Sequence, residues 1–503
     1  MAPAQAIFSH DFDTPFYKGT ARVHTGLFIN NEWVQPVQGG TIDIVNPANA
    51  KILTQVSIGT SEDVDIAVAA AQAAFKSAWG LNVPGAQRGD LLNKLAELVE
   101  QNLDELTALE CANTGIPLAF LRTVLIPRIV GDLRYFAGWA GKVAGKTIET
   151  NPAKFAYTLR QPIGVVAQII PWNAPLAFMT LKIAPALACG CSIVLKPSEI
   201  TPLTALRMCD LIKSAGFPPG VVNIVVGYGT TVGRALSSHL DVRKVSFIGS
   251  VAVGKEVARS AADSNLKKVS LELGGKSPNV IFDDADLDQA LKWTELGIFG
   301  NSGQTCSAGS RIFVQEGIYD KFVEAFVAAA KARKLGNPHL PETAQGPQIS
   351  KIQFDRVLGY IDIGKQEGAT ILTGGRQHGK EGFFIEPTVF TNTRPDMRIV
   401  REEIFGPVGV VVKFRTEEEA IKLANDTSFG LASAIFTLNV NRAIRVSNAI
   451  EAGTVFVNCY NWVEPSLPWT GYKQSGWGHD SGEDALSSYT EVKSVHMNIG
   501  LQM

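Results

Sequence analysis

The spacing of hydrophobic residues changes between two periods along this chain, and the change separates predicted helices from predicted strands. Apolar side chains recur at helical spacing over residues 60–79, where Thr60 and Asp63 match a capping box, and again over residues 88–103. From residue 163 onward, short β-rich runs alternate with helical stretches, an order typical of consecutive βαβ units in a mostly parallel sheet. The expected strands cover residues 164–170, 192–196, 221–226 and 244–249, and the expected helices lie near residues 174–188, 202–215, 230–239 and 252–264.

A second α/β stretch begins with KVSLEL (268–273), which leads into a Gly-rich turn. Two other segments, 154–161 and 487–499, look extended and are able to pair outside the main domains. The later strands are expected at residues 311–315, 408–414, 433–438 and 454–458, with helices near residues 317–333, 349–366, 416–425 and 440–449.

Composition and charge exclude several classes of protein. The chain has 503 residues, of which 46% are apolar and 19% charged, and its formal net charge is -2. This length predicts two or three domains, and the charge gives no electrostatic footprint for nucleic acid. Since no run of about 18 apolar residues occurs, we expect no membrane-spanning helix. We therefore expect neither a nucleic-acid partner nor a membrane partner.

The first 25 residues contain neither an apolar signal core nor an excess of arginine. They predict no secretory signal or transit peptide, and we expect a short disordered or peripheral arm. The six cysteines are sparse and form no C-x-x-C pair, which argues against a disulfide framework or a zinc site. We therefore expect a cytoplasmic protein with no metal site.

Cys306 is the first candidate for chemistry, because it lies in a small, polar and Gly-rich stretch, FGNSGQTCSAGSR (299–311). Most free cysteines are buried small hydrophobic residues, and the other five cysteines fit that description. A thiol on an exposed turn is instead a candidate nucleophile, because reactivity needs access and a stabilised thiolate.

Glu272 lies in LELGGKSP (271–278), between two leucines and before a pair of glycines. Desolvation there would raise the carboxyl pKa and suit a general base. In the alternative interpretation, which the sequence supports equally, Ser270 and Glu272 both point to water from one face of a strand.

Asn173 lies in IIPWNAP (169–175), where a predicted strand meets a helix. This position suits a helix N-cap, with Pro175 in the first turn. The same side-chain amide is also a good donor for a developing oxyanion.

Three segments carry weaker signals for a nucleotide. FIGSVAVGKEV (247–257) follows a strand and opens a helix, but Gly249 and Gly254 do not match the G-x-G-x-x-G spacing. GYGTTVG (227–233) also follows a strand, and tight turns use glycine for backbone reasons alone. LKPSEITP (195–202) supplies Lys196 and Glu199, and an acidic residue there favours NAD over NADP.

Taken together and in this order, these segments are specific. The chain resembles the aldehyde dehydrogenase superfamily, in its NAD-dependent, non-acylating form, continuously from about Gly26 to Met497. The stretches that carry the resemblance are IIPWN, LKPSE, FIGS with Gly254, LELGGKSP, GQTCSAGSR, EEIFGPV (402–408) and GYKQSG (471–476).

The resemblance implies a role for each matching residue. Cys306 matches the nucleophile, Glu272 the general base and Asn173 the oxyanion donor, together with the Cys306 backbone N–H. Lys182 matches a family lysine close to the site. The residues that would bind NAD are Ile169 and Trp172 beside the cofactor, Lys196 and Glu199 at the adenosine ribose, Gly229 near the adenine, Gly249 and Ser250 at the pyrophosphate, and Glu403 and Phe405 at the nicotinamide riboside.

Departures from the common family pattern concern the substrate. Ala174, Leu181 and Gly300 stand where relatives often carry large aromatic residues, and Trp469-Thr470 precedes GYK in place of the commoner Phe-Gly. These changes predict a wide apolar tunnel for bulky or aromatic aldehydes, with Trp462 at its mouth. The expected lining is Ala174, Phe178, Leu181, Gly300, Thr305, Ser307, Val463 and Trp469.

The resemblance also implies the architecture, an α/β fold with a Rossmann-like parallel-sheet cofactor domain, an α/β catalytic domain and a small β oligomerisation extension. We expect a homodimer or homotetramer, since a spare edge strand is otherwise an aggregation hazard. The expected domains are residues 1–145 and 163–272 for NAD, 273–486 for catalysis, and 146–162 with 487–503 for the extension.

Three rival functions remain at this point. A CoA-acylating aldehyde dehydrogenase is disfavoured by Glu272, because a well-placed base favours water as the acyl acceptor. A cysteine hydrolase normally needs a histidine base, and none of the seven histidines lies in a local motif. A non-catalytic protein on the same fold is disfavoured by the intact set of Cys306, Glu272 and Asn173.

Overall fold

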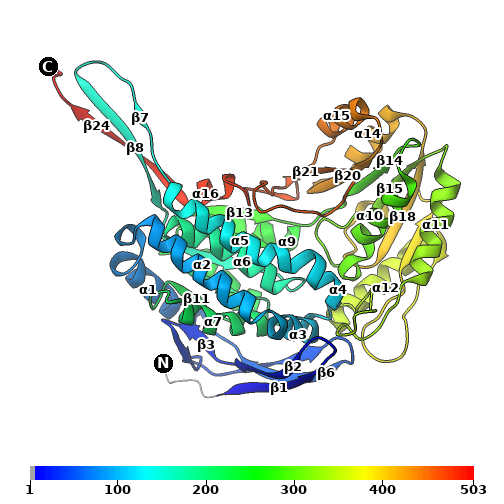
Figure 1. Cartoon of the computed structure of the whole chain (residues 1–503), viewed down its shortest axis with the longest axis horizontal. Helices are drawn as coiled ribbons and strands as arrows, with labels where there is room; N and C mark the ends of the chain where they lie inside the picture. The colour runs from blue at the N-terminus through cyan, green and yellow to red at the C-terminus, as the bar shows by residue number, and fades with distance from the viewer. Residues whose placement is uncertain (1–5) are drawn as a thin grey trace.

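The structure, a computed structural model that describes residues 6–503, is a mixed α/β fold of two lobes, with a narrow β arm projecting from the first lobe (Figure 1). Each lobe is built on one sheet whose central strands are parallel. The predicted fold class is therefore confirmed. None of the helices in residues 6–503 is long and apolar enough to span a membrane.

The first lobe contains an eight-stranded sheet with the order β23-β13-β12-β9-β10-β11-β3-β4. Its five central strands are parallel, and they are buried almost throughout, as expected for a sheet covered on both faces. The strands are β3 (Leu27–Ile29), β4 (Glu32–Val34), β9 (Val165–Ile169), β10 (Ser192–Lys196), β11 (Val222–Ile224), β12 (Lys244–Ile248), β13 (Lys268–Glu272) and β23 (Gly476–Trp477).

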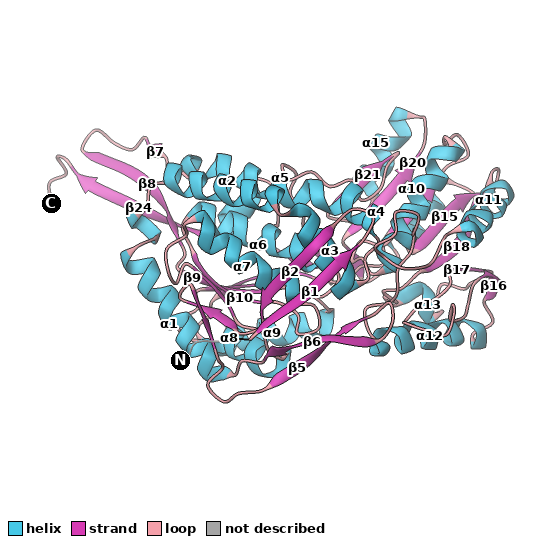
Figure 2. Ribbon diagram, turned by 60° about the horizontal axis from the view of Figure 1, so that its bottom comes forward, coloured by secondary structure: helices cyan, strands magenta, loops and turns pink. Residues whose placement is uncertain are grey.

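Helices cover both faces of this sheet (Figure 2). On one face lie α1 (Ser61–Ser77), α8 (Arg234–Ser238) and α9 (Val251–Ser264). The other face carries α6 (Pro175–Cys189) and α7 (Leu203–Ala215), over which α2 (Gly85–Gln101), α3 (Leu103–Thr114) and α5 (Ile126–Trp139) pack. The predicted capping box at the start of α1 is present, and the Asp63 carboxylate accepts a hydrogen bond from the Thr60 backbone N–H at 2.7 Å.

The second lobe contains a seven-stranded sheet with the order β16-β17-β18-β15-β14-β20-β21, in which only the β16–β17 pair is antiparallel. Its strands are β14 (Pro278–Ile281), β15 (Arg311–Gln315), β16 (Thr370–Thr373), β17 (Thr388–Thr391), β18 (Val408–Phe414), β20 (Ala432–Phe436) and β21 (Thr454–Val457). Its helices are α10 (Leu287–Phe299), α11 (Tyr319–Ala332), α12 (Lys351–Gln366), α13 (Arg398–Arg401), α14 (Glu417–Asn425) and α15 (Val440–Ala449), and short β19 (Phe429–Gly430) pairs with β22 (Tyr472–Lys473).

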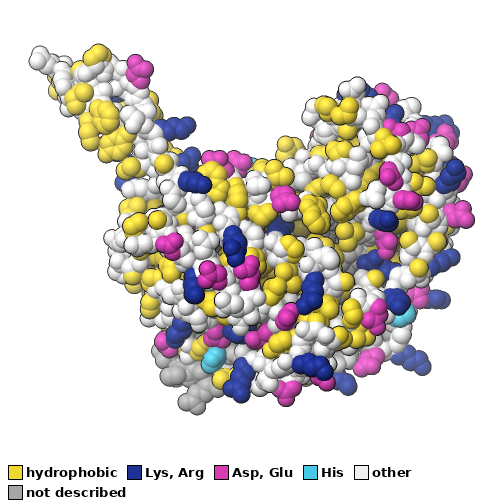
Figure 3. All heavy atoms as spheres, in the orientation of Figure 1, with side chains coloured by type: hydrophobic (Ala, Val, Ile, Leu, Met, Phe, Trp, Pro, Cys, Tyr) yellow, Lys and Arg dark blue, Asp and Glu magenta, His cyan; other side chains and the backbone are white. Residues whose placement is uncertain are grey.

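The arm is a three-stranded antiparallel sheet of β7 (Thr147–Ile148), β8 (Lys154–Pro162) and β24 (Thr490–Asn498). The predicted pairing of the tail with residues 154–161 is confirmed, although the predicted tail strand begins too early, inside α16 (Asp484–Ser488). Apolar side chains gather on its surface (Figure 3), and the exposed ones are Ile148, Phe155, Leu159, Val492 and Met497.

The N-terminal segment differs from the expectation. Residues 7–24 form an antiparallel hairpin of β1 (Ile7–Asp13) and β2 (Lys18–His24), and a second hairpin follows as β5 (Thr41–Asn46) and β6 (Lys51–Ser57). Phe12 is buried against Ala108 and Ala112 of α3, so the disordered or peripheral arm predicted for the first 25 residues is wrong for residues 6–25. Residues 1–5 of that arm lie outside the described residues.

The domain limits drawn from the sequence remain a prediction. One short strand crosses the predicted limit, since β23 lies within residues 273–486 but pairs antiparallel with β13 in the first sheet.

Candidate active site

Cys306 lies on the loop that follows α10, where the backbone is tightly folded. Asn301 and Ser302 have positive φ angles of 47° and 57°, and Gly303 has a φ of 73°. A Cβ atom on Gly303 would lie 2.0 Å from the Gly406 carbonyl oxygen, so only glycine fits there. The loop is therefore pressed against the segment that leads into β18.

Side-chain hydrogen bonds hold this loop in place. The Ser302 hydroxyl donates to the Gly346 carbonyl at 2.8 Å, and the Gln304 side-chain oxygen accepts from the Ile349 N–H at 2.8 Å. The Asn301 amide donates to the Asn173 carbonyl at 2.8 Å and so links the loop to the first lobe. These contacts offset the backbone strain of the two left-handed residues.

The Cys306 side chain is partly exposed, and it lines two cavities at once. The sequence-based expectation of an accessible thiol is met, and Cys111, Cys189, Cys191 and Cys209 are buried as expected. The same expectation is wrong for Cys459, which is only partly buried. Burial raises the pKa of the Cys306 thiol well above its usual range, and the Glu272 carboxylate raises it further. The residues around Cys306 therefore favour the thiol over the thiolate that the sequence led us to expect.

Glu272 ends β13 and is 4% exposed, with Ser270 buried beside it. The interpretation that both residues face water is therefore wrong. Burial raises the pKa of the Glu272 carboxyl, as a general base requires. Neither carboxylate oxygen has a hydrogen-bond partner among the described residues, so Glu272 is free to take a proton from Cys306 or from water.

Asn173 lies between β9 and α6, and its side-chain amide donates to the Gln304 carbonyl at 2.9 Å. The predicted capping role is wrong, because the N-cap of α6 is Ala174. The Glu110 carboxylate instead accepts from the Leu176 N–H at 3.2 Å. An amide nitrogen carries two hydrogens, so Asn173 keeps one donor for the cavity that it lines.

Lys182 lies deep in α6 and does not line the cavities around Cys306 that the described residues form. Its ammonium group forms a buried ion pair with Asp480, with N–O distances of 2.8 and 2.6 Å. Both charges act on Glu272 from a distance, since Asp480 raises the pKa of its carboxyl and Lys182 lowers it. Lys182 is therefore placed behind the site.

A long cleft runs along the carboxyl ends of β9, β10 and β12, which is where open parallel sheets bind ligands. Lys196 donates to the Glu199 carboxylate at 3.1 Å across its floor, and Ser250 caps the first turn of α9. Gly254 faces away, because a Cβ atom there would meet Leu273 at 2.6 Å. The predicted cofactor residues that line this cleft are Ile169, Trp172, Lys196, Glu199, Gly229, Gly249 and Ser250.

Glu403 and Phe405 line a smaller cavity, which shares Trp172, Gly249 and Ser250 with the cleft and ends at Cys306. The Glu403 carboxylate accepts from the Gly275 N–H at 3.1 Å, and burial raises its pKa to about 7. Phe405 has a φ of 63°, and its ring packs edge-on against Trp172 at 5.2 Å.

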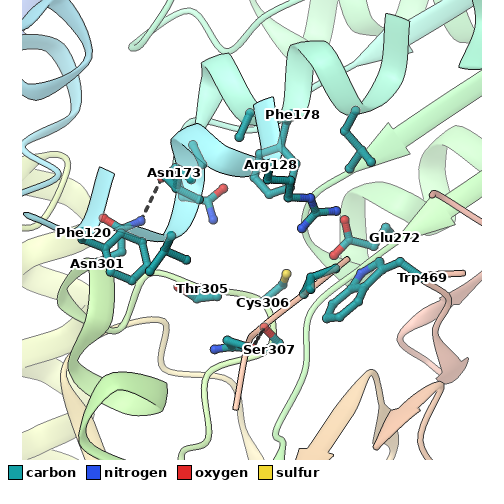
Figure 4. A pocket seen from close by; sticks show the side chains of 17 residues that line it. Phe120, Arg128, Asn173, Phe178, Glu272, Asn301, Thr305, Cys306, Ser307 and Trp469 are labelled. Carbon is teal, nitrogen blue, oxygen red and sulfur yellow. Dashed lines mark hydrogen bonds between the residues drawn. The ribbon is translucent and has the colours of Figure 1, made fainter. Parts of the chain in front are cut away.

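The second cavity at Cys306 is largely apolar (Figure 4). Gly300 does not line it, because a Cβ atom there would meet the Phe120 ring at 2.8 Å. The prediction that Gly300 opens the tunnel is therefore wrong, since Phe120 fills that space. Trp462 is exposed, packs against Trp293 and is not among the residues that line the cavity, although Asn461 and Val463 on either side of it are. The predicted residues that do line the cavity are Ala174, Phe178, Leu181, Thr305, Ser307, Val463 and Trp469.

Sequence reasoning missed Phe120, Arg128, Glu110 and Asp480. Arg128 carried a usable signal, because it interrupts the apolar run VLIPRIVG (124–131). Glu110 and Asp480 carried no such signal, because their partners, Leu176 and Lys182, are remote in sequence.

The fold and the site together are those of an enzyme that binds a small molecule in a cavity beside a thiol. Residues 33–495 match the sequence model of the aldehyde dehydrogenase family. The chain is 55% identical to an aldehyde dehydrogenase of Agaricus bisporus, over 99% of this chain and 100% of that protein. It is 50% identical to aldehyde dehydrogenase, cytosolic 1, of Mus musculus, over 95% of each.

The solved NAD+ complex of an aldehyde dehydrogenase from Bacillus cereus is similar in structure, with a TM-score of 0.93 and 47% sequence identity. The superposition covers 95% of this chain and 97% of that one. The chain therefore belongs to the aldehyde dehydrogenase family, and it is an enzyme of aldehyde oxidation.

Proposed function

We propose that this protein oxidises an aldehyde to a carboxylic acid with NAD, through a thioester on Cys306. The observation that carries the proposal is the position of this thiol. It lines both the apolar cavity and the smaller cavity that is continuous with the long cleft. Asn173 and Glu272 line the same apolar cavity, so a donor and a base face one reacting carbon.

The residues of the chain supply each proton and charge in turn. Glu272 takes the thiol proton as the sulfur attacks the carbonyl carbon, and Asn173 and the Cys306 backbone N–H bind the oxyanion. Loss of hydride from that carbon leaves the thioester. Glu272, once it has released its proton, removes one from water, which hydrolyses the thioester to the acid and restores the thiol.

The backbone at Gly229 in the cleft is open, because a Cβ atom there would meet nothing within 4 Å. A flat ring such as the adenine of NAD could therefore lie against it. Lys196 and Glu199 would hold the adenosine ribose, Gly249 and Ser250 the pyrophosphate, and Glu403 the second ribose. When bound, NAD supplies the acceptor of the hydride. The Glu199 carboxylate supports NAD over NADP, because it would repel a 2′-phosphate.

Water is the proposed acyl acceptor, and the apolar lining supports bulky or aromatic aldehydes as substrates. The alternative of a CoA-acylating enzyme is disfavoured by the free carboxylate of Glu272 beside the thiol. The exposed apolar arm supports a homodimer or homotetramer, and the named cytosolic relative supports a cytoplasmic location. Light scattering of the purified protein measures the oligomer.

A steady-state screen tests the proposal. Aliphatic, aromatic and amino aldehydes are offered with NAD or NADP, with and without CoA, to the wild type and to Cys306→Ala. We expect NADH formation that needs no CoA and disappears in Cys306→Ala, while Cys459→Ala, at a half-buried thiol outside both cavities, stays active. NADH formation by Cys306→Ala would overturn the proposal.

A further inference from the structure

Arg128 is the only lysine or arginine among the described residues that line the apolar cavity. It comes from α5, and its side chain is 17% exposed. Figure 4 shows its guanidinium group projecting into the cavity, toward Glu272 and Trp469. A cation held among aromatic and aliphatic side chains costs free energy unless an anion or several acceptors surround it.

The contacts that Arg128 makes within the chain are weak. Its Nη2 atom reaches the Ser481 hydroxyl at 3.5 Å, the outer limit for a hydrogen bond. Its Nε atom forms a long ion pair with the buried Asp132 carboxylate at 3.7 Å, beyond hydrogen-bond distance. Asp132 is fully buried, and burial raises the pKa of its carboxyl to about 7, although the charge of Arg128 lowers it.

Glu272 accepts no hydrogen bond from the Arg128 guanidinium group either. The positive charge of Arg128 lowers the pKa of the Glu272 carboxyl, so the two groups sense each other. However, both oxygens of Glu272 lack a hydrogen-bond partner in the part of the chain that the structure describes. The planar donors of Arg128 therefore remain available to a ligand in the cavity.

Building on the proposed function, we infer that the aldehydes this enzyme prefers carry a carboxylate, which Arg128 binds while the aldehyde carbon lies at Cys306. A carboxylate matches the guanidinium fork, which can donate two parallel hydrogen bonds to it. The rest of such a substrate is apolar, because Phe120, Phe178 and Trp469 line the same cavity.

Matched substrates separate charge from size. 4-Formylbenzoate and 4-formylbenzamide have nearly the same shape, but only the first is an anion, and succinic semialdehyde paired with butanal repeats the comparison without a ring. The measured quantity is the ratio of kcat/KM for the anion to kcat/KM for its neutral partner. We expect this ratio to exceed 1 in the wild type and to fall by about 10- to 100-fold in Arg128→Met, mainly through KM.

Two further variants control for structure. Arg128→Lys keeps the charge but loses the fork, so it should recover part of the ratio. Arg134→Met removes an exposed arginine of the same helix, paired with Glu100, and should leave the ratio unchanged. Thermal unfolding of each variant checks that the fold is intact.

The outcomes distinguish the inference from the proposed function. An equal loss of kcat for anionic and neutral aldehydes in Arg128→Met would mean that Arg128 only positions Glu272, and the inference would be wrong. A wild-type ratio at or below 1 for both pairs would also overturn it, while neutral aldehydes were still oxidised. Failure to oxidise any aldehyde would instead overturn the proposed function.

Discussion

The side-chain amide of Asn301 donates a hydrogen bond to the backbone carbonyl of Asn173 at 2.8 Å. One residue belongs to the loop that carries Cys306, and the other precedes α6 in the first lobe. Asn173 returns the contact, because its own side chain donates to the Gln304 carbonyl at 2.9 Å. Two hydrogen bonds that cross between the lobes therefore fix Asn173, the proposed oxyanion donor, to the loop that carries Cys306.

This relationship predicts the effect of Asn173→Ala. Removal of one oxyanion donor costs about 3–4 kcal/mol, so kcat should fall by about 100- to 1000-fold. NAD should bind nearly as before, because the long cleft is lined by other residues. Single-turnover NADH formation and NAD titration measure the two effects. Normal turnover by the variant would show that Asn173 holds no oxyanion.

The raised pKa of Glu272 predicts the pH profile. Because burial favours the protonated carboxyl, the base form appears only at a higher pH than for an ordinary glutamate, and kcat should fall as pH decreases through that range. Glu272→Gln should lower kcat by about 100- to 10,000-fold and remove this acidic limb. The measurement is kcat from about pH 5 to about pH 9. An unchanged limb in the variant would assign it to another group.

Glu110 should make the fold less stable as pH rises. Its carboxyl is 1% exposed, and burial raises its pKa from 4.5 to about 7. A raised folded-state pKa gives stability that is present below the unfolded pKa and lost as pH rises through the folded pKa, here a loss of about 3 kcal/mol at most. Glu110→Gln should therefore match the wild type near pH 5 and exceed its free energy of unfolding near pH 8.

The contacts of Glu110 permit this substitution, because a glutamine oxygen can accept from Leu176 N–H while its amide nitrogen donates to the Thr204 hydroxyl, which is the donor to Glu110 in the wild type. Glu100→Gln, at an exposed ion pair with Arg134, is the control and should change stability by about 0.5 kcal/mol or less at either pH. Urea unfolding of the three proteins at both pH values gives the comparison. A constant difference between Glu110→Gln and the wild type would contradict the predicted titration.

Ala174→Phe should narrow the apolar cavity. Ala174 lines it and is 6% exposed, so a ring at this position must enter space that a substrate needs. We expect kcat/KM for benzaldehyde to fall by about 10- to 100-fold, with a smaller change for acetaldehyde. Equal losses for both aldehydes would show that the new ring disturbs the site and does not restrict substrate size.

The sequence predicted those parts of the molecule whose signal is local. β10, β15, β18 and α15 begin and end at the predicted residues, because their apolar runs are short and bounded by turn residues. Most of the predicted site residues line the long cleft or one of the two cavities at Cys306, and their roles remain a prediction. The N-terminal hairpin was missed, since Phe12 has its buried partners on α3, about a hundred residues further along the chain.

Side chains at the cavity were predictable only in part, for the same physical reason. The sequence shows that Gly300 has no side chain, but it does not show that the ring of Phe120 fills the space this leaves. Arg128 likewise reaches the cavity from a helix whose packing the sequence pattern did not reveal. Space in a cavity depends on all the segments around it, and periodicity describes only one segment at a time.

The sulfur of Cys306 borders two cavities that share Asn173 and Phe178, one continuous with the long cleft and one largely apolar. If the proposed cofactor occupies the first cavity, part of the apolar one stays open, so we expect alkylating reagents small enough for the apolar side still to label the thiol. The fraction of Cys306 thiols that such a reagent labels would then count the sites that are accessible from the apolar cavity.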